Sequence, residues 1–528
     1  MKTRILLTVM LGLVGMSGKG QVMFQKTYDI NGYTMGTSAR QTTDGGYIMT
    51  GLVKISGLSL GVGLVKTNVN GDILWTKTYQ TSLDGSASSV QQTNDGGYIL
   101  IGGLADSITD TINVFLIKTD VNGGLLWAKR YGGNNVKHGY GYSVKQTSDG
   151  GYIIVGYTNS FGVGDNDVYL IKINSTGGLL WSKTFGGTGD DRGYSVQQTS
   201  DGGFIIAGCT KSFGAGLYDV YLIKTNSSGT LMWSKTYGGV QNEYGYSVQQ
   251  TTDGGYIIVG NTTSFTAGNR DVYLLKTDAN GNLLWTKSFG GTDDDYASLV
   301  QQTTDGGYVF TGSTKSFGGG YYDAYLIKTN SSGVLLWSKA YGGTGIDNGC
   351  SVQQTTDGGY VVAGFTHSFA TSSEEFYLIK TDANGNSGCH QSNPSTIQGS
   401  TSTIVGTAAT QVSSGCVVTS ISIVTGTGGS AKNACYYGLN EKEDQVLYIH
   451  VSPNPFTTQA TLTIQGIKND NYKTLSVYNL LGQEVQNIFV GSATSITINR
   501  NNMPSGMYFY KLCDDNKTVL GMGKMMVE

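Results

Sequence analysis

The fold can be read from residues 194–225, YSVQQTSDGGFIIAGCTKSFGAGLYDVYLIKT, together with LLWSKTF at residues 179–185 just before them. Four short runs in this stretch, LLWSKTF, YSVQQT, GFIIAG and VYLIKT, are rich in Ile, Val, Tyr and Trp, and clusters of Gly, Asn, Asp and Ser separate them. Runs of this length and composition indicate β-strands joined by turns. The stretch therefore predicts one unit of four strands.

The Asp-Gly-Gly turn shows that this unit occurs seven times. It begins at Asp44, Asp95, Asp149, Asp201, Asp253, Asp305 and Asp357. Asp-Gly and Gly-Gly supply the positive φ that a tight hairpin needs. The six tryptophans keep the same period and should fill one structural position: Trp75, Trp127, Trp181, Trp233, Trp285 and Trp337. A fixed period of this size with four strands per unit is typical of propeller blades.

The two ends of the repeat array predict how it closes. The seventh repeat lacks its fourth strand, because NGNSGCHQ at residues 384–391 stands where a Trp strand is expected. The missing strand is found at residues 22–28, VMFQKTY, with Phe24 in the tryptophan position. We expect this segment to pair with residues 376–381 and to form the outer edge of the last sheet. The prediction is an all-β fold, a seven-bladed β-propeller over residues 21–387 closed by the N-terminal strand.

The repeat resembles a known family. KTDANGNLLW at residues 276–285, which recurs across residues 22–385, is similar to the repeats of secreted bacterial β-propellers of the quinoprotein-like superfamily. The resemblance implies the fold only. Quinone-dependent dehydrogenases of that superfamily usually have eight blades and a dedicated cofactor pocket, and the sequence shows neither.

The first 20 residues have the pattern of a secretory signal peptide. Lys2 and Arg4 precede an apolar run over residues 5–16, and small residues follow up to Gly20. The run is too short for a permanent membrane anchor, and we expect cleavage before Gln21. No other stretch is apolar enough for a membrane-spanning helix.

Residues 388–443 lose the period and are rich in Ser, Thr and Gly, so they are interpreted as a linker or a small insert. They contain Cys389, Cys416 and Cys435. In an exported protein two of the three could form a disulfide, most plausibly Cys389 with Cys435, although sequence does not determine the pairing. Cys209 and Cys350 lie in different repeats and are expected to be single buried thiols.

Four ordered motifs mark residues 444–528 as a separate module. They are SPNPF at 452–456, LSVYNLLGQEV at 475–485, MPSGMY at 503–508 and GKMMV at 523–527. The module resembles the type A C-terminal sorting domain of the type IX secretion system of Bacteroidota. The matching positions are Pro453, Asn454, Pro455, Phe456, Tyr478, Gly482, Gln483, Pro504, Gly506, Tyr508 and Lys524.

This second resemblance implies a small immunoglobulin-like β-sandwich that the outer-membrane translocon of the secretion system recognises, and that is often removed afterwards. The protein would then be secreted or held at the cell surface. The alternative is an ordinary additional β-domain used for binding.

The composition shows no enzyme chemistry. The four histidines, His138, His367, His390 and His450, form no cluster in sequence, and neither zinc-type cysteine spacing nor a phosphate-binding glycine loop is present. A formal net charge of -3 argues against a nucleic-acid partner. We expect a monomeric, non-enzymatic protein that requires no cofactor.

The loops that follow the Trp strands hold the candidate binding residues, because functional differences between repeats concentrate in loops. The candidates are Asp190, Asp191, Arg192, Asp293, Asp294, Asp295, Tyr321 and Tyr322. Clustered carboxylates could bind Ca²⁺, and exposed tyrosines could stack on sugars or peptides. Alternatively, each recurring Asp bonds to turn amides within its own repeat.

A second recurring acid precedes the VYLIK strand, and a lysine follows it five residues later, as in Asp167 and Lys172. Because this pair repeats around the array, it is predicted to be architectural.

The sequence thus favours an exported scaffold that binds a glycan or a protein, or that acts in adhesion. One alternative is a secreted polysaccharide-active enzyme with a pair of carboxylates on the loop face. The other is a purely structural surface component without a discrete ligand.

Overall fold

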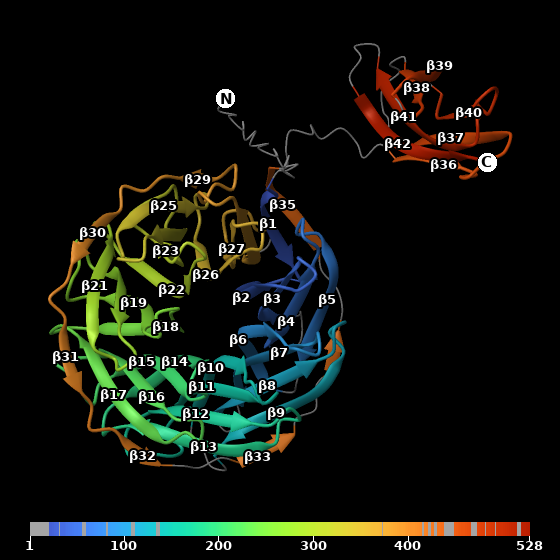
Figure 1. Cartoon of the computed structure of the whole chain (residues 1–528). Coiled ribbons are helices and arrows are strands. Elements are labelled where there is room, and N and C mark those ends of the chain that lie inside the picture. The colour runs from blue at the N-terminus through green and yellow to red at the C-terminus, as the bar shows by residue number, and fades with distance from the viewer. Residues whose placement is uncertain are drawn as a thin grey trace, which may run out of the picture. The chain divides into compact units, whose positions relative to one another are not determined.

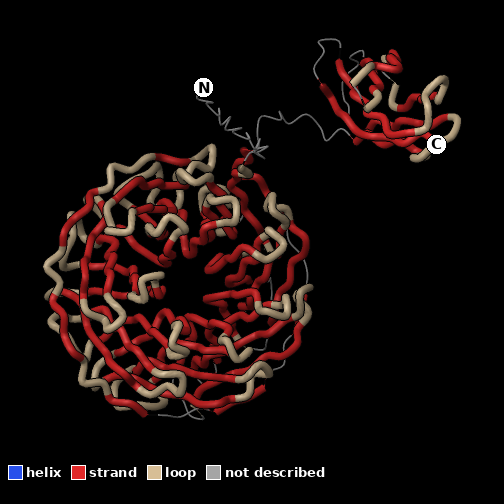
Figure 2. The backbone as a smooth tube through the Cα atoms, in the orientation of Figure 1, coloured by secondary structure: helices blue, strands red, loops and turns tan. Residues whose placement is uncertain are grey.

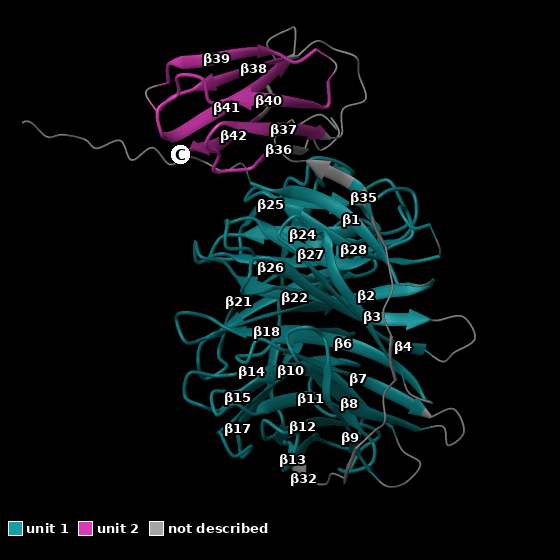
Figure 3. Ribbon diagram, turned by 90° about the vertical axis from the view of Figure 1, so that its right-hand side faces the viewer, with its two compact units in different colours: residues 1–439 teal, residues 440–528 magenta. Residues whose placement is uncertain are grey.

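The computed structural model consists of strands, turns and loops, with no helix in the part that it describes (Figure 2). It describes residues 21–528 except 31, 55–59, 81–82, 107–110, 134–137, 372, 414–416, 421–423, 427–429, 438–447, 466–472, 481, 492 and 515–518. The predicted signal peptide, residues 1–20, lies outside the described residues. The chain divides into two compact units, Met1–Leu439 and Asn440–Glu528, which are coloured separately in Figure 3. The expected all-β class is confirmed.

The first unit contains seven antiparallel sheets of five strands, numbered here in chain order. Sheet 1 comprises β2 (Thr34–Gln41), β3 (Tyr47–Lys54), β4 (Leu60–Thr67), β5 (Ile73–Gln80) and β34 (Val424–Gly426). Sheet 2 comprises β6 (Asp84–Gln92), β7 (Tyr98–Asp106), β8 (Thr111–Thr119), β9 (Leu125–Gly132) and β33 (Val417–Ser420). Sheet 3 comprises β10 (Gly139–Gln146), β11 (Tyr152–Thr158), β12 (Asp167–Ile173), β13 (Leu179–Gly186) and β32 (Gln411–Ser413).

The remaining four sheets repeat this plan. Sheet 4 comprises β14 (Asp191–Gln198), β15 (Phe204–Thr210), β16 (Asp219–Thr225), β17 (Leu231–Gly238) and β31 (Ile404–Thr407). Sheet 5 comprises β18 (Glu243–Gln250), β19 (Tyr256–Thr262), β20 (Asp271–Thr277), β21 (Leu283–Gly290) and β30 (Ile397–Ser400). Sheet 6 comprises β22 (Asp295–Gln302), β23 (Tyr308–Thr314), β24 (Asp323–Thr329), β25 (Leu335–Tyr341) and β29 (Gln391–Ser392). Sheet 7 comprises β26 (Asp347–Gln354), β27 (Tyr360–Thr366), β28 (Glu375–Thr381), β1 (Met23–Asp29) and β35 (Ser430–Tyr437).

The Asp-Gly-Gly turns join the first two strands of each sheet, as predicted. In sheet 1, Gly45 has a φ of 83°, in the left-handed region, and its N–H donates to the carbonyl of Thr42 at 2.9 Å. A Cβ on Gly46 would lie 2.1 Å from the carbonyl oxygen of Thr67, so the second glycine lets the neighbouring strand approach closely. The two glycines therefore have different roles, one conformational and one steric.

The aspartate of each turn binds the lysine of the third strand, which explains why both residues recur. Asp201 accepts hydrogen bonds from the Oγ1 of Thr199 at 2.5 Å and the N–H of Gly203 at 2.9 Å. Its carboxylate also lies 2.8 Å from the Nζ of Lys224, which is almost completely buried. All seven repeats contain this ion pair. The lysine was correctly predicted to be architectural, but its partner is the turn aspartate.

Neighbouring sheets pack face to face and lie side by side in a ring (Figure 1). Hydrophobic cores fill the junctions between neighbouring sheets; Ile153 and Val155 of sheet 3, for example, pack with Phe204 and Ile206 of sheet 4. At this junction Trp181 contacts Phe204, with ring centroids 5.9 Å apart. The tryptophan position is thus a sheet-to-sheet contact.

Strand β1 joins the two ends of the repeat array. It pairs antiparallel with β28, as expected, from Phe24 opposite Lys380 to Tyr28 opposite Phe376. Phe24 contacts Tyr47 of sheet 1 at 6.1 Å, as the tryptophans do elsewhere. The pairing and the role of Phe24 are as predicted.

Hydrogen bonds between sheets continue across this closure. In each junction the side-chain Oε1 of a glutamine at the end of the innermost strand accepts from a turn N–H of the preceding sheet, at 2.8–3.1 Å. The last of these seven bonds runs from the N–H of Thr356 in sheet 7 to Gln41 in sheet 1. Sheet 7 therefore contacts sheet 1 in the same way as the other sheets contact one another.

The segment interpreted as a linker or small insert adds the fifth strand to every sheet, which the sequence interpretation missed. Strands β29 to β35 pair in turn with β25, β21, β17, β13, β9, β5 and β1, so the chain travels once around the ring in reverse order. We call residues 391–437 the belt. Strand β1 is consequently not the outer edge of sheet 7, because β35 covers it. The belt pairs with backbone groups that an edge strand would otherwise expose.

Threonines at a seven-residue spacing attach the belt to the ring. The hydroxyls of Thr396, Thr403 and Thr410 bond to those of Tyr325, Tyr273 and Tyr221, one in each of three successive sheets. This spacing, T-I-x-G in two of the three units, was the sequence signal for the belt. It was missed because seven residues is far shorter than the period of the ring repeats.

Cys389, which lies two residues before the belt, is disulfide-bonded. The side chain of its expected partner, Cys435, lies outside the described side chains, so the pairing remains a prediction. The backbone agrees with it. Cys435 stands opposite Gln25 on β1, and the Nε2 of Gln25 donates to the carbonyl of Cys389 at 2.5 Å. Cys209 and Cys350 are free thiols, as expected, but only Cys209 is buried, whereas Cys350 is half-buried.

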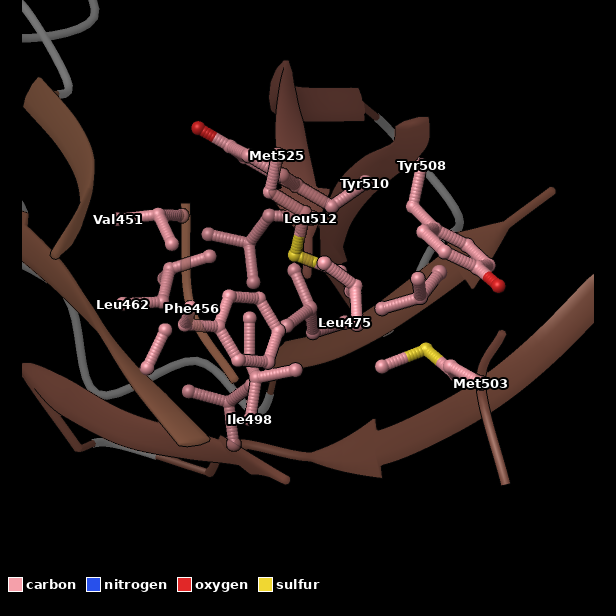
Figure 4. Packing of buried hydrophobic residues seen from close by; sticks show 14 of the residues in the cluster. Val451, Phe456, Leu462, Leu475, Ile498, Met503, Tyr508, Tyr510, Leu512 and Met525 are labelled. Atoms are coloured by element: carbon pink, nitrogen blue, oxygen red, sulfur yellow. The ribbon is translucent and has the colours of Figure 1, made fainter. Parts of the chain in front are cut away.

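The second unit consists of two antiparallel sheets around one hydrophobic core. One contains β36 (Tyr448–Ser452), β37 (Gln459–Gln465) and β40 (Ser495–Asn499). The other contains β39 (Glu484–Phe489), β38 (Lys473–Tyr478), β41 (Gly506–Asp514) and β42 (Val519–Val527). Phe456, 2% exposed, lies in this core with Leu462, Leu475 and Ile498 (Figure 4).

Candidate functional site

The loop face is the side of the ring that carries two sets of loops. One set joins the fourth strand of one sheet to the innermost strand of the next, as at residues 187–190, and the other joins the second and third strands, as at residues 211–218. The two sets touch, because the N–H of Lys211 donates to the carbonyl of Asp190 at 2.9 Å. All eight candidate ligand-binding residues lie in or next to these loops.

Two of the candidate aspartates are buried and hold the loops together. Asp191 is completely buried and accepts from the N–H of Gly187 at 2.7 Å and the Oγ of Ser212 at 2.6 Å. Asp295 makes the same two bonds in sheet 6, at 2.7 and 2.8 Å. At these positions the geometry favours the alternative in which the recurring Asp bonds to turn amides.

Asp190 and Arg192 form a polar cluster at the junction of sheets 3 and 4. Asp190 accepts from the Nε of Arg192 at 2.9 Å, the hydroxyl of Tyr218 at 2.8 Å and the amide of Asn166 at 2.9 Å. Burial alone would raise the pKa of Asp190, but these hydrogen bonds hold it below its ordinary value. The guanidinium of Arg192 also lies over the ring of Tyr157, 4.9 Å from its centroid.

A second cluster combines the other candidates at sheets 5 and 6. Lys315 lies 3.7 Å from the carboxylate of Asp293 and 5.4 Å from the ring centroid of Tyr321. Tyr321, 59% exposed, contacts Tyr322, with ring centroids 5.2 Å apart. Asp294 contributes its backbone carbonyl, which accepts from the N–H of Lys315 at 2.9 Å. This cluster offers aromatic faces and a cation to solvent.

An arc of tyrosines lies further in, and the sequence analysis did not single it out. The ring centroids of Tyr142, Tyr194 and Tyr246 are 5.0 and 5.1 Å apart in succession, and Tyr244 stacks on Tyr246 at 5.9 Å. The signal was their restricted distribution. Only three of the seven repeats have Tyr at this position of the innermost strand, whereas the others have Thr37, Ser88, Ser298 or Cys350.

Metal binding finds no support from these residues. Within the described part of the chain, no group of three or more His, Cys, Asp or Glu side chains is placed to hold a metal ion. Several carboxylates instead form buried pairs across sheet junctions. Asp167 and Asp191, for example, both crowd Gly186, since a Cβ there would lie 2.1 and 2.7 Å from their oxygens.

In four successive junctions, burial raises the pKa of the acid that begins the third strand of a sheet. Burial raises the pKa of Asp167 to about 6, and the charge of Asp191 adds to the effect. The same holds, with a pKa of about 6 in each case, for Asp219, Asp271 and Asp323. The turn aspartates show the opposite shift. Although burial alone would raise it, the hydrogen bonds of Asp149 to Lys172 and Thr147 hold its pKa at about 2.

We expect the free energy of unfolding to fall as the pH rises from 5 to 7.5. A folded-state pKa above the unfolded value, about 3.9, means that the folded protein retains protons that the unfolded chain releases. The retained protons contribute fully to the free energy of unfolding below pH 4. This contribution is lost as the pH rises through 6, and the loss is on the order of 2 kcal/mol per group. Urea midpoints at the two pH values provide the measurement.

Asp271→Asn is the matched variant for this prediction, because Asn113 already occupies the equivalent position in sheet 2. The variant should reduce the difference between the two midpoints. A protein that is equally stable or more stable at pH 7.5 would contradict the assignment.

In the second unit the motif residues hold the two chain ends of the module together. The side-chain Oδ1 of Asn454 accepts from the N–H of Met526 at 2.8 Å, and the N–H of Phe456 donates to the carbonyl of Met526 at 3.1 Å. Tyr508 donates its hydroxyl to the carbonyl of Pro504 at 2.9 Å. Gly482, at a φ of 78°, forms the turn that Gln483 completes.

Residues 450–528 match the family model described as the secretion system C-terminal sorting domain. The chain carries a type IX secretion sorting domain. This domain marks proteins that are exported by type IX secretion to the cell surface or beyond it. In the part of the chain that the structure covers, no helix reaches the length and hydropathy needed to cross a bilayer.

The sorting domain presents one row of side chains across its four-stranded sheet. Register places Glu484 next to Tyr478, Tyr478 next to Phe509, and Phe509 next to Lys524. Lys524 is exposed and Phe509 is 44% exposed. Two motif residues, Tyr478 and Lys524, thus belong to this surface row, whereas Phe456 and Tyr508 are buried and stabilise the module.

Similarity to characterised proteins is otherwise low. Regulatory protein FlaEY of Caulobacter vibrioides is 26% identical over 178 residues, 29% of this chain and 18% of that protein. PorZ, a surface component of the type IX secretion system of Porphyromonas gingivalis, matches with 11% identity and a TM-score of 0.36, over 95% of this chain and 60% of PorZ. Sqt1 from Chaetomium thermophilum matches with 9% identity and a TM-score of 0.35, over 67% of this chain and all of that one. Such low scores carry no functional argument.

Proposed function

We propose that the exported chain is a non-enzymatic scaffold that binds a glycan or a protein, or acts in adhesion, through its loop face. In this proposal the ring is a seven-bladed β-propeller closed by β1, and the sorting domain is an immunoglobulin-like sandwich. Seven sheets with seven equivalent junction bonds support the first assignment. Two sheets around one core support the second.

The observation that carries the proposal is the cluster of Lys315, Tyr321 and Tyr322. Lys315 and Tyr322 recur in sheet 4 as Lys211 and Tyr218, whereas the position of Tyr321 is not aromatic in sheets 3, 4, 5 and 7. The cluster offers an aromatic face next to a cation. Tyrosine contributes large contact area together with a hydroxyl, which suits both sugars and peptides. The recurring acids are already committed to internal contacts, such as those of Asp191 with Gly187 and Ser212. A polysaccharide-active enzyme would instead need two carboxylates open to substrate.

Glycan and protein arrays probed with the mature chain, with and without Ca²⁺, would test this proposal. We expect saturable binding that the double variant Tyr321→Ala/Tyr322→Ala weakens by about tenfold or more. Leu336→Ala, at an exposed position on β25, is the control and should bind as the wild type does. Calcium dependence would implicate an ion in the loops. No saturable binding to either array, or binding that the double variant leaves unchanged, would refute the proposed role of this face.

A further inference from the structure

The centre of the ring contains a cavity with a chemistry that differs from the loop face. Its volume is about 540 Å³, in the range of pockets that bind small ligands. The innermost strands of all seven sheets, β2, β6, β10, β14, β18, β22 and β26, line it, and Figure 1 shows these strands nearest the centre of the ring. A ligand here would meet one side chain from each repeat at each level.

One level of this wall is a circle of glutamines that two cations interrupt. The glutamines are Gln91, Gln197, Gln249, Gln301 and Gln353, and the equivalent positions in sheets 1 and 3 hold Arg40 and Lys145. Each glutamine accepts, through its Oε1, a hydrogen bond from a backbone N–H of the next sheet, at 2.6–2.9 Å. Arginine and lysine have no acceptor atom, so this bond is lost at both positions. Arginine and lysine in place of glutamine therefore remove two hydrogen bonds between sheets.

Nothing in the cavity neutralises the two charges. Of the described residues that line it, none is acidic, and neither Arg40 nor Lys145 forms an ion pair within the described chain. Arg40 donates from Nη1 to the carbonyl of Ala39 at 2.9 Å. Burial lowers the pKa of Lys145 to about 7, and the charge of Arg40 lowers it as well. A bound anion would favour the charged forms of both side chains and so oppose these two effects.

The rest of the wall suits an oxyanion. Ser38, Ser89 and Ser143 and the glutamines line the same cavity, and their hydroxyl and amide groups are hydrogen-bond donors. Arginine and lysine with such donors are the usual partners of carboxylate, sulfate and phosphate groups. At the next level Tyr142, Tyr194 and Tyr246 offer aromatic surface to the body of a ligand.

We propose that the central cavity binds a small organic oxyanion, with Arg40 and Lys145 holding its acidic group. The site does not depend on the loop-face role proposed above, since it uses different residues on a different surface. Carboxylate, sulfate and phosphate share the chemistry that the two cations recognise.

The test is calorimetric titration of the mature chain with glucuronate, sodium sulfate and inorganic phosphate, each at matched ionic strength with chloride. We expect saturable binding of at least one of the three. The double variant Arg40→Gln/Lys145→Gln restores the repeat consensus and its two hydrogen bonds, so it should fold with unchanged or higher thermal stability. It should bind about tenfold more weakly or not at all.

Two further variants make the result specific. Lys145→Arg keeps the charge and should retain binding, and Lys211→Gln removes an exposed lysine of the loop face without affecting it. The anion that binds most tightly identifies the acidic group. Absence of saturable binding for all three anions would overturn the proposal, as would undiminished binding by the double variant. Either result would leave the array experiment on Tyr321 and Tyr322 unaffected.

Discussion

A chain that ends after Leu439 should no longer reach the cell surface. The cut falls at the boundary between the two compact units and leaves β35 in place, so the ring and its belt remain complete. The export signal matched at residues 450–528 is lost entirely. We therefore expect nearly all surface-exposed or released protein to disappear, as measured by cell fractionation and by protease accessibility on intact cells.

Point variants distinguish two requirements for export, a folded sorting domain and recognition of its surface by the secretion system. Phe456→Ala removes a buried core side chain and should destabilise the module by about 3–5 kcal/mol, and export should fall with it. Phe509→Ser and Lys524→Gln change the exposed row and should reduce export while the module stays folded. If the truncated chain still reached the surface in normal amounts, the sorting domain would not direct its export.

Replacing Phe24 by Ala should destabilise the ring by about 3–5 kcal/mol, because the side chain is fully buried in the junction that closes it. The same strand also supplies Tyr28, whose hydroxyl donates to the carbonyl of Gly71 in sheet 1 at 2.7 Å. Both contacts join the first and last sheets. Urea denaturation of the mature chain, followed by tryptophan fluorescence, measures the loss.

Phe24→Trp is the matched control. It installs the residue that six other repeats have at this position, so the free energy of unfolding should change by less than about 1.5 kcal/mol. Should Phe24→Ala behave like an exposed substitution, with a loss under about 0.5 kcal/mol, then β1 would not be a structural part of the closure.

The candidate site was only partly visible in the sequence. The loops after the Trp strands could be located, because acids and tyrosines cluster there, and Lys315 does bring Asp293 and Tyr321 together. The sequence could not separate buried from exposed members of these clusters. Asp190 and Asp191 are neighbours in the chain, yet their contacts differ. Asp190 binds Arg192 and Tyr218, whereas the buried Asp191 accepts a hydrogen bond from the N–H of Gly187 in the loop.

Arg40 and Lys145 also show that the sequence does not reveal which residues share an environment. Each departs from the glutamine of its repeat, a difference that can be seen by aligning the seven units. Their common environment is a property of the ring, because they lie 105 residues apart and meet only where the innermost strands converge on one cavity. The sequence shows that these two residues differ from the repeat. Only the closed ring shows that both line the same cavity.

The amino-acid pattern alone determined the strands, the seven repeats, the hairpin turns and the pairing of β1 with β28, since local turn chemistry and a long regular period specify them. The sorting domain was equally evident from four short motifs. The belt was decided by tertiary structure. Its strands are two to eight residues long and rich in Ser, Thr and Gly, so they have little strand preference of their own and form against edges that the finished sheets provide.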